Sequence, residues 1–554
     1  MRIISSNITS PLGTTTEENY RAVRSGRSAC LPHKAGKRDV PFDFCAALFP
    51  EPIDFERLAI SSATDALGKA GKIDTERTIL ILSTTKGDTD SPLGDTASRI
   101  AVALGIPTPP IVVCNACISG AAAMVLALRL LRRGTYDYAV VIGADVQTRF
   151  TLAGFNSLMA LSDEPCRPFD AERRGLNLGE AAATVVITSK PSDGEDWHLT
   201  AGAITNDAYH TSTPHPKGEG CMRAINQVME GYDASRLATI SVHGTATMYN
   251  DQMESKAIER AGLSATPLSA LKGYYGHTLG AAGLLETILT ARALDDGIIL
   301  PCLGYNEIGV SGKVCISQHM IKTDKHDFLK IISGFGGCNA ALLLRKQTNC
   351  NDVSLRSDDI HLNTVHRVRI TNNSIVLDDT AIPTATTGRA MLTEVYRQRT
   401  GQYPRFHKMD TLCRLAFVAT ELLTEDLDGC TDDMCIVLFN KTSSMVSDRK
   451  FRETISDDEH FFPSPSVFVY TLPNICTGEI ALRHKTLNET SFYILPCKDD
   501  ATMHTILQAT MLECKAKWII GGWIDCKDDD DFECEVGRIE GLKNCKIEEL
   551  KIKK

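Results

Sequence analysis

Two cysteines three positions apart, Cys114 and Cys117, precede a run of small residues in the segment CNACISGAAAM. The apolar segment PIVV comes directly before them, and CISGAAAMVLALRLLRRG is typical of a helix that ends near Gly134. We therefore expect Cys117 where a strand turns into a helix, beside unpaired N–H groups and the positive end of the helix dipole. This position lowers the pKa of a thiol and supplies donors for an oxyanion. Cys117 is a candidate nucleophile, although simple packing is also compatible with one cysteine there.

Two histidines lie in similar surroundings, His243 in SVHGTATMYND and His277 in LKGYYGHTLGAAGLLE. Each follows a short apolar or small-residue segment and precedes small residues, which is typical of a strand end or loop beside a cleft. Either histidine alone is compatible with a structural role. Together with Cys117 they provide one thiol and two imidazoles, a set suited to acyl transfer followed by a second proton-handling step.

The C-x-x-C spacing of Cys114 and Cys117 also raises zinc binding or thioredoxin-like redox chemistry as alternatives. In the sequence, however, no second pair lies nearby, and a helix-initiating cysteine before SGAAA favours a nucleophile. The pair spans a strand end and lacks the flanking context of the redox motif. We expect no metal site, with Cys114 as a buried strand residue.

Apolar strands alternate with helices around these residues. FERLAISSATDALGKA (55–70) predicts a helix with one apolar face, and TILILS (78–83) and YAVVIGAD (138–145) predict buried strands. This alternation is typical of an α/β fold with a mostly parallel sheet covered on both faces.

A similar order of elements returns late in the chain. MDTLCRLAFVATELL (409–423) predicts a helix, CIVLFNKTSSMVSD a strand and loop, PSVFVYTLPNICTGEIAL a strand leading into a helix, and KWIIGGWID (517–525) a closing strand. We interpret this order as an internal repeat that arose by duplication. The polar stretch 346–365 is the predicted linker, and the charged tail 527–554 is a predicted solvated extension.

The composition limits the classes to which the protein can belong. A chain of 554 residues with 43% hydrophobic residues is typical of soluble globular protein with two to four domains. The N-terminus lacks the apolar core of a signal peptide, and no stretch reaches the roughly eighteen apolar residues of a membrane span. Nineteen cysteines without an export signal favour free thiols in a reducing, cytoplasmic location. The net charge of −10 disfavours nucleic acid as the main partner.

Residues 1–345 resemble the β-ketoacyl synthases, the condensing enzymes of fatty acid and polyketide synthesis, which have a thiolase-type fold. The segments that carry the resemblance occur in the order of the family: SPLG, ACISG, YAVVIGADV, GFNSLMALS, RPFDAERRGLNLGEAAATVVI, NDAYHTSTP, HGTAT, KGYYGHTLGAAGLLE and SGFGGCNAALLL. The two-histidine pattern is similar to that of the elongating branch, which depends on a carrier protein. The resemblance implies a layered thiolase-like domain with mixed, mostly parallel sheets.

The resemblance also implies a reaction. Cys117 would accept the acyl group from an acyl carrier protein as a thioester. His243 and His277 would polarise a malonyl thioester and support its decarboxylation, and the enolate would attack the acyl-cysteine. No metal or redox cofactor is implied, because the substrates are carried on the phosphopantetheine of the carrier protein.

Supporting residues follow from the same resemblance. Lys272 would belong to the catalytic group, where it and Glu286 would hold the histidines in the right hydrogen-bonding state. The N–H groups of Cys117 and Phe335 would form the oxyanion hole, and Phe335 would also gate the pocket. Lys272 and Glu286 are equally compatible with an ordinary ion pair when taken alone.

Further positions concern binding. Thr245 and Thr247 resemble the pair that hydrogen-bonds the pantetheine arm, and Asp251 is an expected supporting residue, although turn and helix-cap roles also fit these three. The acidic carrier protein would need a basic patch, and the helix end LRLLRRG offers one or, alternatively, an ordinary solvated helix end. The candidate docking residues are Arg129, Arg132 and Arg133.

Thiolase chemistry is a further alternative, because thiolases use a second cysteine. Cys338 in GFGGCN occupies the place where synthases usually have threonine, and the preceding phenylalanine-glycine motif is synthase-like. We therefore expect decarboxylative condensation.

Residues 366–526 resemble a second synthase N-terminal half with no C-terminal half after it. Such half-domains and chain-length-factor-like subunits occur in polyene and pigment synthesis, which suggests an aryl polyene or related product. Aligning ICTG with CISG on the glycine places Ile475 opposite Cys117 and rotates Cys476 by about 100° on the helix. The histidines have no counterparts, so we expect this half to be catalytically silent.

The silent half raises a hypothesis about assembly. It would occupy, within the same chain, the surface that a second synthase subunit covers in a homodimer; an ordinary homodimer or recruitment of another ketosynthase-like subunit are the alternatives. The rival function is that of a non-catalytic carrier-protein-binding or chain-length-factor subunit. Retention of Cys117, His243 and His277 argues against that rival.

Overall fold

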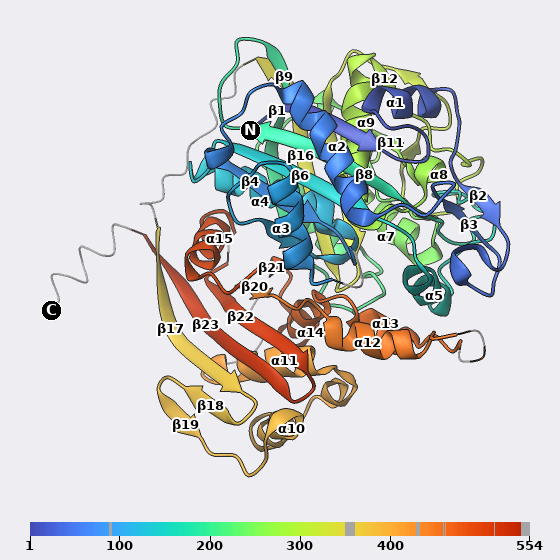
Figure 1. Ribbon diagram of the computed structural model, residues 1–554. Helices are drawn as coiled ribbons and strands as arrows, with labels where there is room; N and C mark the ends of the chain where they lie inside the picture. Colours follow the sequence, from blue (N-terminus) through green and yellow to red (C-terminus); the bar gives the residue numbers. More distant parts are fainter. Residues whose placement is uncertain are drawn as a thin grey trace.

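The structure is a computed structural model, which describes residues 1–87, 91–348, 360–427, 433–457, 459, 461–514 and 516–543. We call residues 1–348 the N-terminal part and residues 360–543 the C-terminal part. In Figure 1 the C-terminal part, coloured yellow to red, lies below the N-terminal part. Three sheets with one common strand order organise the molecule.

The first sheet has the order β5-β4-β6-β8-β1. Strands β5, β4 and β6 are parallel to one another, β8 is antiparallel to β6, and β1 is antiparallel to β8. Its strands are β1 (Arg2–Thr9), β4 (Thr78–Ser83), β5 (Ile111–Val113), β6 (Tyr138–Asp145) and β8 (Ala181–Thr188). Its helices are α1 (Thr16–Arg24), α2 (Phe55–Ala70), α3 (Leu93–Ala103), α4 (Ser119–Arg132) and α5 (Arg149–Ser157). Every residue of β4 is buried, as the apolar run TILILS predicts for a strand covered on both faces.

The second sheet repeats this order as β11-β10-β15-β16-β9. Its strands are β9 (Glu195–Asn206), β10 (Leu237–Ser241), β11 (Pro267–Ser269), β15 (Asp327–Gly334) and β16 (Cys338–Thr348), with β13 (Cys315–Ile316) beside β11. Its helices are α6 (Glu219–Val228), α7 (Met248–Arg260), α8 (Lys272–Tyr275) and α9 (Ala282–Asp295). Short strands form two more small sheets: β2 (Leu31–His33), β3 (Phe44–Ala47) and β7 (Leu178–Gly179) in one, β12 (Ile298–Ile299) and β14 (Ile321–Lys322) in the other.

Helix α4 is the central element of the core. All residues from Ser119 to Leu131 are buried, because the helix packs against β6, β9 and α9 at once. The small residues at its start allow this close packing. A Cβ on Gly120 would lie 2.8 Å from the carbonyl oxygen of Gly280, so the two segments touch backbone to backbone.

The third sheet, in the C-terminal part, has the order β21-β20-β22-β23-β17, again with three parallel and two antiparallel strands. Its strands are β17 (Ile360–Thr371), β20 (Met434–Asn440), β21 (Thr490–Ile494), β22 (Trp518–Asp528) and β23 (Asp531–Lys543), and β18 (Ser374–Leu377) and β19 (Thr380–Ile382) extend it beyond β17. Its helices are α10 (Gly388–Arg399), α11 (Thr411–Leu423), α12 (Met445–Glu453), α13 (Pro465–Tyr470), α14 (Ile475–His484) and α15 (Asp500–Glu513).

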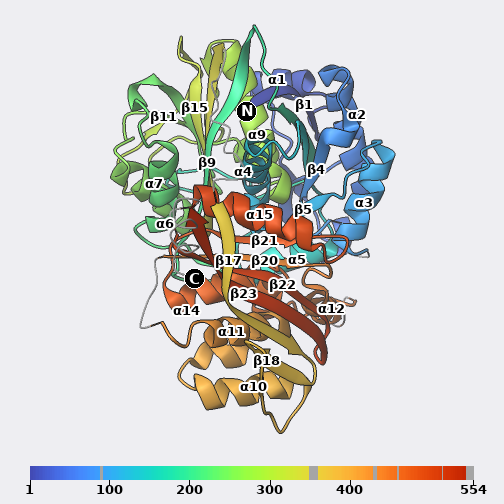
Figure 2. The ribbon, with the colours of Figure 1, turned by 90° about the vertical axis from the view of Figure 1, so that its left-hand side faces the viewer.

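Strands β5 and β21 join the two parts. They pair antiparallel, with Val113 opposite Tyr493 and Val112 opposite Ile494. The side-chain oxygen of Asn115 accepts a hydrogen bond of 2.8 Å from the backbone N–H of Phe492, which extends the pairing. Helix α15 packs against α4, and Figure 2 shows α15 lying along the boundary between the parts. The first and third sheets are therefore continuous across this boundary.

The strand register corrects the expected alignment of the repeat. Val113 and Tyr493 lie opposite each other and face the same side of the sheet, so a local two-fold relation between the strands exchanges them. With the same offset, Cys117 corresponds to Cys497, which precedes α15. The segment PSVFVY, expected as a strand, forms helix α13. Its apolar residues pack into a helical layer, because the strand position beside β20 is taken by β21. Ile475 and Cys476 are therefore not the counterparts of Cys117.

Two boundaries also differ from expectation. The predicted linker 346–365 begins inside β16 and ends inside β17, and residues 349–359 lie outside the described residues. The tail from residue 527 is not a solvated extension up to residue 543. Acidic residues 528–531 form the turn between β22 and β23, and alternate residues of β23, such as Cys534 and Val536, are buried. Residues 544–554 lie outside the described residues.

Two further observations concern membrane-spanning helices and the state of the cysteines. In the described part of the chain, no helix combines the length and apolar character needed to cross a membrane. The cysteines that the structure describes are free thiols.

Candidate functional site

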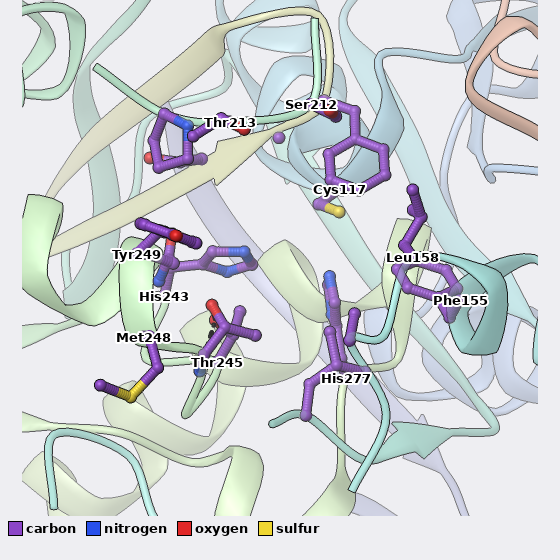
Figure 3. Close-up of a pocket in the computed structure, with 18 of the residues that line it drawn as sticks. Cys117, Phe155, Leu158, Ser212, Thr213, His243, Thr245, Met248, Tyr249 and His277 are labelled. Atoms are coloured by element: carbon purple, nitrogen blue, oxygen red, sulfur yellow. Dashed lines mark hydrogen bonds between the residues drawn. The ribbon is translucent and has the colours of Figure 1, made fainter. Parts of the chain in front are cut away.

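Cys117, His243 and His277 meet at the base of one cavity of about 320 Å³. One ligand-type atom from each side chain lies within 4.8 Å of those of the other two. The side chains are only 8%, 3% and 1% exposed, and the two imidazole rings meet nearly edge to face at 5.0 Å between centroids. Figure 3 shows the three side chains pointing toward a common space. The structure thus brings together the three residues that the sequence singles out for chemistry.

Cys117 lies in a short 3₁₀ turn, Ala116–Ile118, between β5 and α4. The preceding Ala116 has a φ of +48°, an uncommon backbone conformation that a tight turn imposes on a non-glycine residue. Burial raises the pKa of the Cys117 thiol to about 12, although the Lys272 cation and the backbone N–H groups of Cys117 and Phe335 act in the opposite direction. Burial thus acts against the lowering of this pKa that the position before a helix predicts. The thiol needs a base when it reacts.

The backbone around His243 is held by two buried charged groups. The Glu254 carboxylate accepts from the backbone N–H of His243 at 2.5 Å and of Gly244 at 2.8 Å. The Lys272 ammonium donates to the carbonyl of His243 at 2.7 Å. Lys272 therefore acts on the position of His243 and not on a bound molecule.

His277 is fixed in one hydrogen-bonding state. Its Nδ1 accepts from the backbone N–H of Leu279 at 3.2 Å, so the neutral ring carries its proton on Nε2. That Nε2, like Nδ1 of His243, is buried and has no hydrogen-bond partner in the described structure. The cavity therefore contains a free N–H donor on His277.

A buried charge cluster lies behind the histidines. Glu286 accepts from Lys272 at 2.6 Å with one oxygen and from Lys330 with the other. The Glu254 carboxylate also interacts electrostatically with Lys330. Burial lowers the pKa of both histidines well below the ordinary value, and the Lys272 and Lys330 cations lower it further. Both imidazoles are neutral at physiological pH.

Sequence reasoning missed Lys330. The signal was available, because this lysine is the one charged residue within the apolar run FLKIISG of β15. A lysine in a fully buried strand requires an acidic partner. Its partner, Glu286, lies on α9, and the sequence alone does not reveal that pairing.

Thr245 and Thr247 line the same cavity, and their hydroxyl groups lie 2.9 Å apart. Thr247 precedes α7 at the N-cap position, but its side chain makes no cap hydrogen bond. Asp251, in the first turn of α7, accepts from the backbone N–H groups of Phe169 and Ala246 at 2.7 and 3.2 Å. Asp251 thus holds the threonine loop in place.

The loop after β15 brings Phe335 to the cavity beside Cys117. A Cβ on Gly334 would lie 3.1 Å from the nitrogen of Cys117, so the two backbones approach closely. Cys338 is buried, its Sγ lies 3.2 Å from the carbonyl of Phe335, and burial raises the pKa of its thiol. Cys338 does not line the cavity, so the position of its thiol does not support thiolase chemistry.

The cavity continues beyond Cys117 into a slot of about 20 Å³. Phe155 and Phe335 line the slot from the N-terminal part, and Phe468 and Leu472 line it from the C-terminal part. Lys86 closes this end, because its ammonium pairs with Asp448 of α12 at 2.6 Å. The sequence did not reveal this wall, since its members are hundreds of residues apart.

The three arginines expected to dock a carrier protein lie elsewhere. Arg129 is buried and pairs with Glu489 at 2.6 Å, and Arg132 pairs with Glu513 at 3.0 Å. Arg133 donates to the Gln508 side chain at 2.6 Å. The docking expectation is wrong, because the C-terminal part covers this end of α4, where its acidic residues pair with Arg129 and Arg132 and its Gln508 binds Arg133.

Thiol and imidazole groups are also ligands that zinc prefers. Cys117, His243 and His277 are the one such group found among the described residues. The Lys272 and Lys330 cations act on both imidazoles and oppose a bound cation there. The donor set therefore fits acyl chemistry better than metal binding.

Comparison with known proteins shows a similarity to one family. Residues 54–192 match the N-terminal domain of β-ketoacyl synthases, and residues 198–306 match the C-terminal domain. Within these matched ranges the chain is similar to the β-ketoacyl synthases, and the fold is thiolase-like.

Particular relatives extend this finding. The chain is 34% identical over 271 residues to 3-oxoacyl-[acyl-carrier-protein] synthase 2 of Rhizobium meliloti and 30% identical over 270 residues to that of Vibrio cholerae. The matched segments cover 46% and 45% of this chain but 64% and 65% of those relatives. The chain thus matches slightly under two thirds of the length of these relatives.

Solved structures show the same fold. A ketosynthase, ApeO, in complex with its chain length factor, ApeC, from Xenorhabdus doucetiae is 25% identical, with a TM-score of 0.55 over 62% of this chain and 98% of that chain. The PfaC keto synthase-chain length factor is 13% identical, with a TM-score of 0.75 over 98% of this chain and 78% of that chain. The second likeness concerns the fold alone, and it includes the C-terminal part.

Proposed function

We propose that this protein is a β-ketoacyl-[acyl carrier protein] synthase that catalyses decarboxylative condensation in fatty acid or polyketide synthesis. The observation that carries the proposal is the meeting of Cys117, His243 and His277 within 4.8 Å at the base of a cavity. The similarity of residues 54–192 and 198–306 to the two domains of β-ketoacyl synthases supports it.

In the first step, the Cys117 sulfur attacks the thioester carbon of an acyl group on the carrier protein. The thiol proton passes to a neutral imidazole, and the carrier thiolate leaves and takes up that proton. The backbone N–H groups of Cys117 and Phe335 stabilise the oxyanion of the tetrahedral intermediate. The acyl group remains on Cys117 as a thioester.

In the second step, a malonyl thioester on a carrier protein loses CO₂. His243 and the free Nε2–H of His277 donate to its thioester oxygen, and the negative charge left by CO₂ is held as an enolate. The enolate carbon attacks the acyl-Cys117 carbon, the bond to sulfur breaks, and Cys117 recovers a proton. The product is a 3-oxoacyl group on the carrier protein.

Binding roles belong to the same proposal. Thr245 and Thr247 hydrogen-bond the pantetheine arm, which carries the substrates, so no separate cofactor is needed. The carrier protein approaches the cavity mouth, where Met248, Tyr249 and Arg174 line the opening. Met248 and Tyr249 are exposed apolar residues. Arg174 is an exposed cation that an acidic partner could share with Glu164, with which it pairs at 3.3 Å.

We further propose that the C-terminal part is a degenerate synthase N-terminal half. Its sheet has the strand order of the first sheet, and the counterpart of Cys117 is Cys497, which is exposed and does not line the cavity. Strand β21 occupies the edge of β5, so the C-terminal part takes the place of a partner subunit within the chain. It does not itself accept an acyl group.

Product analysis tests the proposed reaction. The protein is incubated with acetyl carrier protein and malonyl carrier protein, and the carrier protein is analysed by mass spectrometry. We expect an acetoacetyl carrier protein from the native chain and none from His243→Ala or His277→Ala. Decarboxylation without a condensed product would contradict the condensation, and no reaction at all would instead favour a non-catalytic carrier-binding subunit.

A further inference from the structure

The C-terminal part contributes a side chain to the loop that forms the proposed oxyanion hole. Asn474 immediately precedes α14 and is 2% exposed. Its Nδ2 donates a hydrogen bond of 2.8 Å to the carbonyl of Phe335 and lies 3.7 Å from the sulfur of Cys338. Residue 474 thus reaches across the boundary to the residue beside Cys117.

The side chain of Asn474 is not used to cap its own helix. Asparagine at an N-cap position usually accepts a hydrogen bond from the second or third N–H of the helix. Here no such bond forms, and the side-chain oxygen of Asn474 is buried without a partner. The first two N–H groups of α14 already donate to backbone carbonyls, Ile475 to Leu472 and Cys476 to Pro473, so capping of α14 does not explain this side chain.

The loop that Asn474 contacts requires external support. Gly336 and Gly337 both have positive φ, so the backbone after Phe335 has more conformational freedom than other residues allow. The N–H of Gly336 donates to Thr211 at 2.7 Å, and Asn206 donates to the carbonyl of Gly336 at 2.8 Å. The carbonyl of Phe335 is held by Asn474 and by the weak thiol donor of Cys338.

Helix α14 contacts the loop after Phe335 at a second residue. Gly478, one turn further along α14, lies against the backbone of Gly336. A Cβ at position 478 would be 2.6 Å from the Gly336 carbonyl oxygen and 2.9 Å from its Cα. Only glycine permits this approach, and α14 thereby limits movement of the Phe335–Gly337 loop on one side.

From these contacts we infer that Asn474 is a positioning residue for acyl transfer, which fixes the Phe335 backbone so that its N–H points at the oxyanion on Cys117. The inference rests on the proposed function of Cys117. It assigns the C-terminal part a second role besides covering β5, because the site is incomplete without α14. In the proposed function, acyl transfer depends on the oxyanion donors, whereas decarboxylation depends on His243 and His277. Loss of the Asn474 contact should therefore slow acyl transfer and leave decarboxylation nearly unchanged.

Three variants test this role. Asn474→Ala removes the donor, and Gly478→Ala pushes the loop while improving the helix propensity of α14. Asn440→Ala is the matched control, because Asn440 is a buried asparagine of the C-terminal part whose side chain bonds only the nearby Ser443. Single-turnover acylation of Cys117 is followed by intact mass, and CO₂ release from malonyl carrier protein is measured in parallel.

We expect Asn474→Ala and Gly478→Ala to lower the maximal acylation rate by about 10- to 100-fold, in the range found when an oxyanion donor is misplaced or lost. The carrier-protein concentration at half-maximal rate and the rate of CO₂ release should change less than about twofold. Asn440→Ala should retain the native acylation rate even where its melting temperature falls. Native acylation rates in both α14 variants would overturn the inference.

Asn474→Asp adds a pH signature. A protonated aspartic acid can donate to the Phe335 carbonyl, whereas an ionised one cannot. Relative to the native chain, acylation by Asn474→Asp should therefore decline as pH rises from about 5 to 8. A constant ratio across this range would contradict the role of the donor.

Hydrogen exchange tests the inference independently of the proposed function. If the native chain takes up no acyl group, the proposed function fails, and the amide exchange of residues 333–339 still decides whether Asn474 holds the loop. We expect exchange in this segment to be at least about tenfold faster in Asn474→Ala than in the native chain or Asn440→Ala. Equal exchange in all three proteins would overturn the inference.

Discussion

Arg129 of α4 and Glu489, which precedes β21, form a buried ion pair at 2.6 Å across the boundary between the two parts. Glu489 accepts from two nitrogens of the guanidinium, at 2.9 and 2.6 Å, so the pair is bidentate. This contact anchors α4, the helix that follows Cys117, to the C-terminal part.

Removing one partner of this pair should be costly. Glu489→Ala leaves the Arg129 cation buried with only Glu513 nearby, and we expect a loss of about 3 to 5 kcal/mol in the free energy of unfolding. Denaturant unfolding of the whole chain measures it. The double variant Arg129→Met with Glu489→Leu should recover most of this loss. A loss below about 1 kcal/mol in Glu489→Ala would mean that the guanidinium is solvated.

Removing the Lys330 cation should change the pH dependence of condensation. The histidines act as neutral groups, and the positive charge of Lys330 helps to hold their pKa values well below the ordinary value. In Lys330→Met these pKa values rise, so the neutral fraction falls on the acidic side. We expect the acid limb of kcat/KM to move upward by about one pH unit.

The matched control for this shift is Lys346→Met, which removes a lysine that pairs with Asp295 away from the site. Its acid limb should coincide with that of the native chain. An unchanged acid limb in Lys330→Met would show that the charge cluster does not set the state of the histidines.

The Cys117 thiol should react as a group with a high pKa. Because burial raises its pKa to about 12, only a small fraction is thiolate at neutral pH. We expect the rate of alkylation at Cys117 to rise about tenfold per pH unit between about pH 7 and 10. Peptide mapping of the alkylated protein measures this rate. A rate that levels off below pH 8 would indicate a thiolate–imidazolium pair in the resting site.

Phe468 should limit the length of the acyl group. This ring lines the slot beyond Cys117 and rests against Gly154, where a Cβ would lie 2.0 Å from the ring. Phe468→Ala should raise the ratio of kcat/KM for octanoyl over acetyl carrier protein by about tenfold or more.

Phe451→Ala is the matched variant for Phe468→Ala. Phe451 packs in the same aromatic cluster, at 5.2 Å from Phe468, but does not line the slot. Both changes should destabilise the chain by about 3 to 5 kcal/mol, whereas the preference for octanoyl should change only in Phe468→Ala. Equal preferences in both variants would mean that another residue ends the slot.

The sequence predicted elements that depend on local pattern. The helix at 55–70 and the strands at 78–83 and 138–145 have the predicted bounds, since their apolar periodicity is complete within each segment. The positions of Cys117, His243 and His277 at turns also followed from local signals. Their common cavity was expected from the family resemblance.

Long-range packing explains what the sequence did not predict. The segment PSVFVY has the composition of a strand, but β21 already occupies the strand position, so the segment forms α13. Arg129 has the sequence signature of a solvated helix end, and only contact with Glu489, 360 positions away, shows that it is buried. Lys330 and Asn474 depend on equally distant partners.

The central claim is that Cys117 carries the acyl group and that the C-terminal part is silent. Intact mass after incubation with acetyl carrier protein tests it most directly, in the native chain, Cys117→Ala and Cys476→Ala. We predict one acetyl adduct in the native chain and in Cys476→Ala, and none in Cys117→Ala. An adduct that persists in Cys117→Ala, or its absence from the native chain, would contradict the claim.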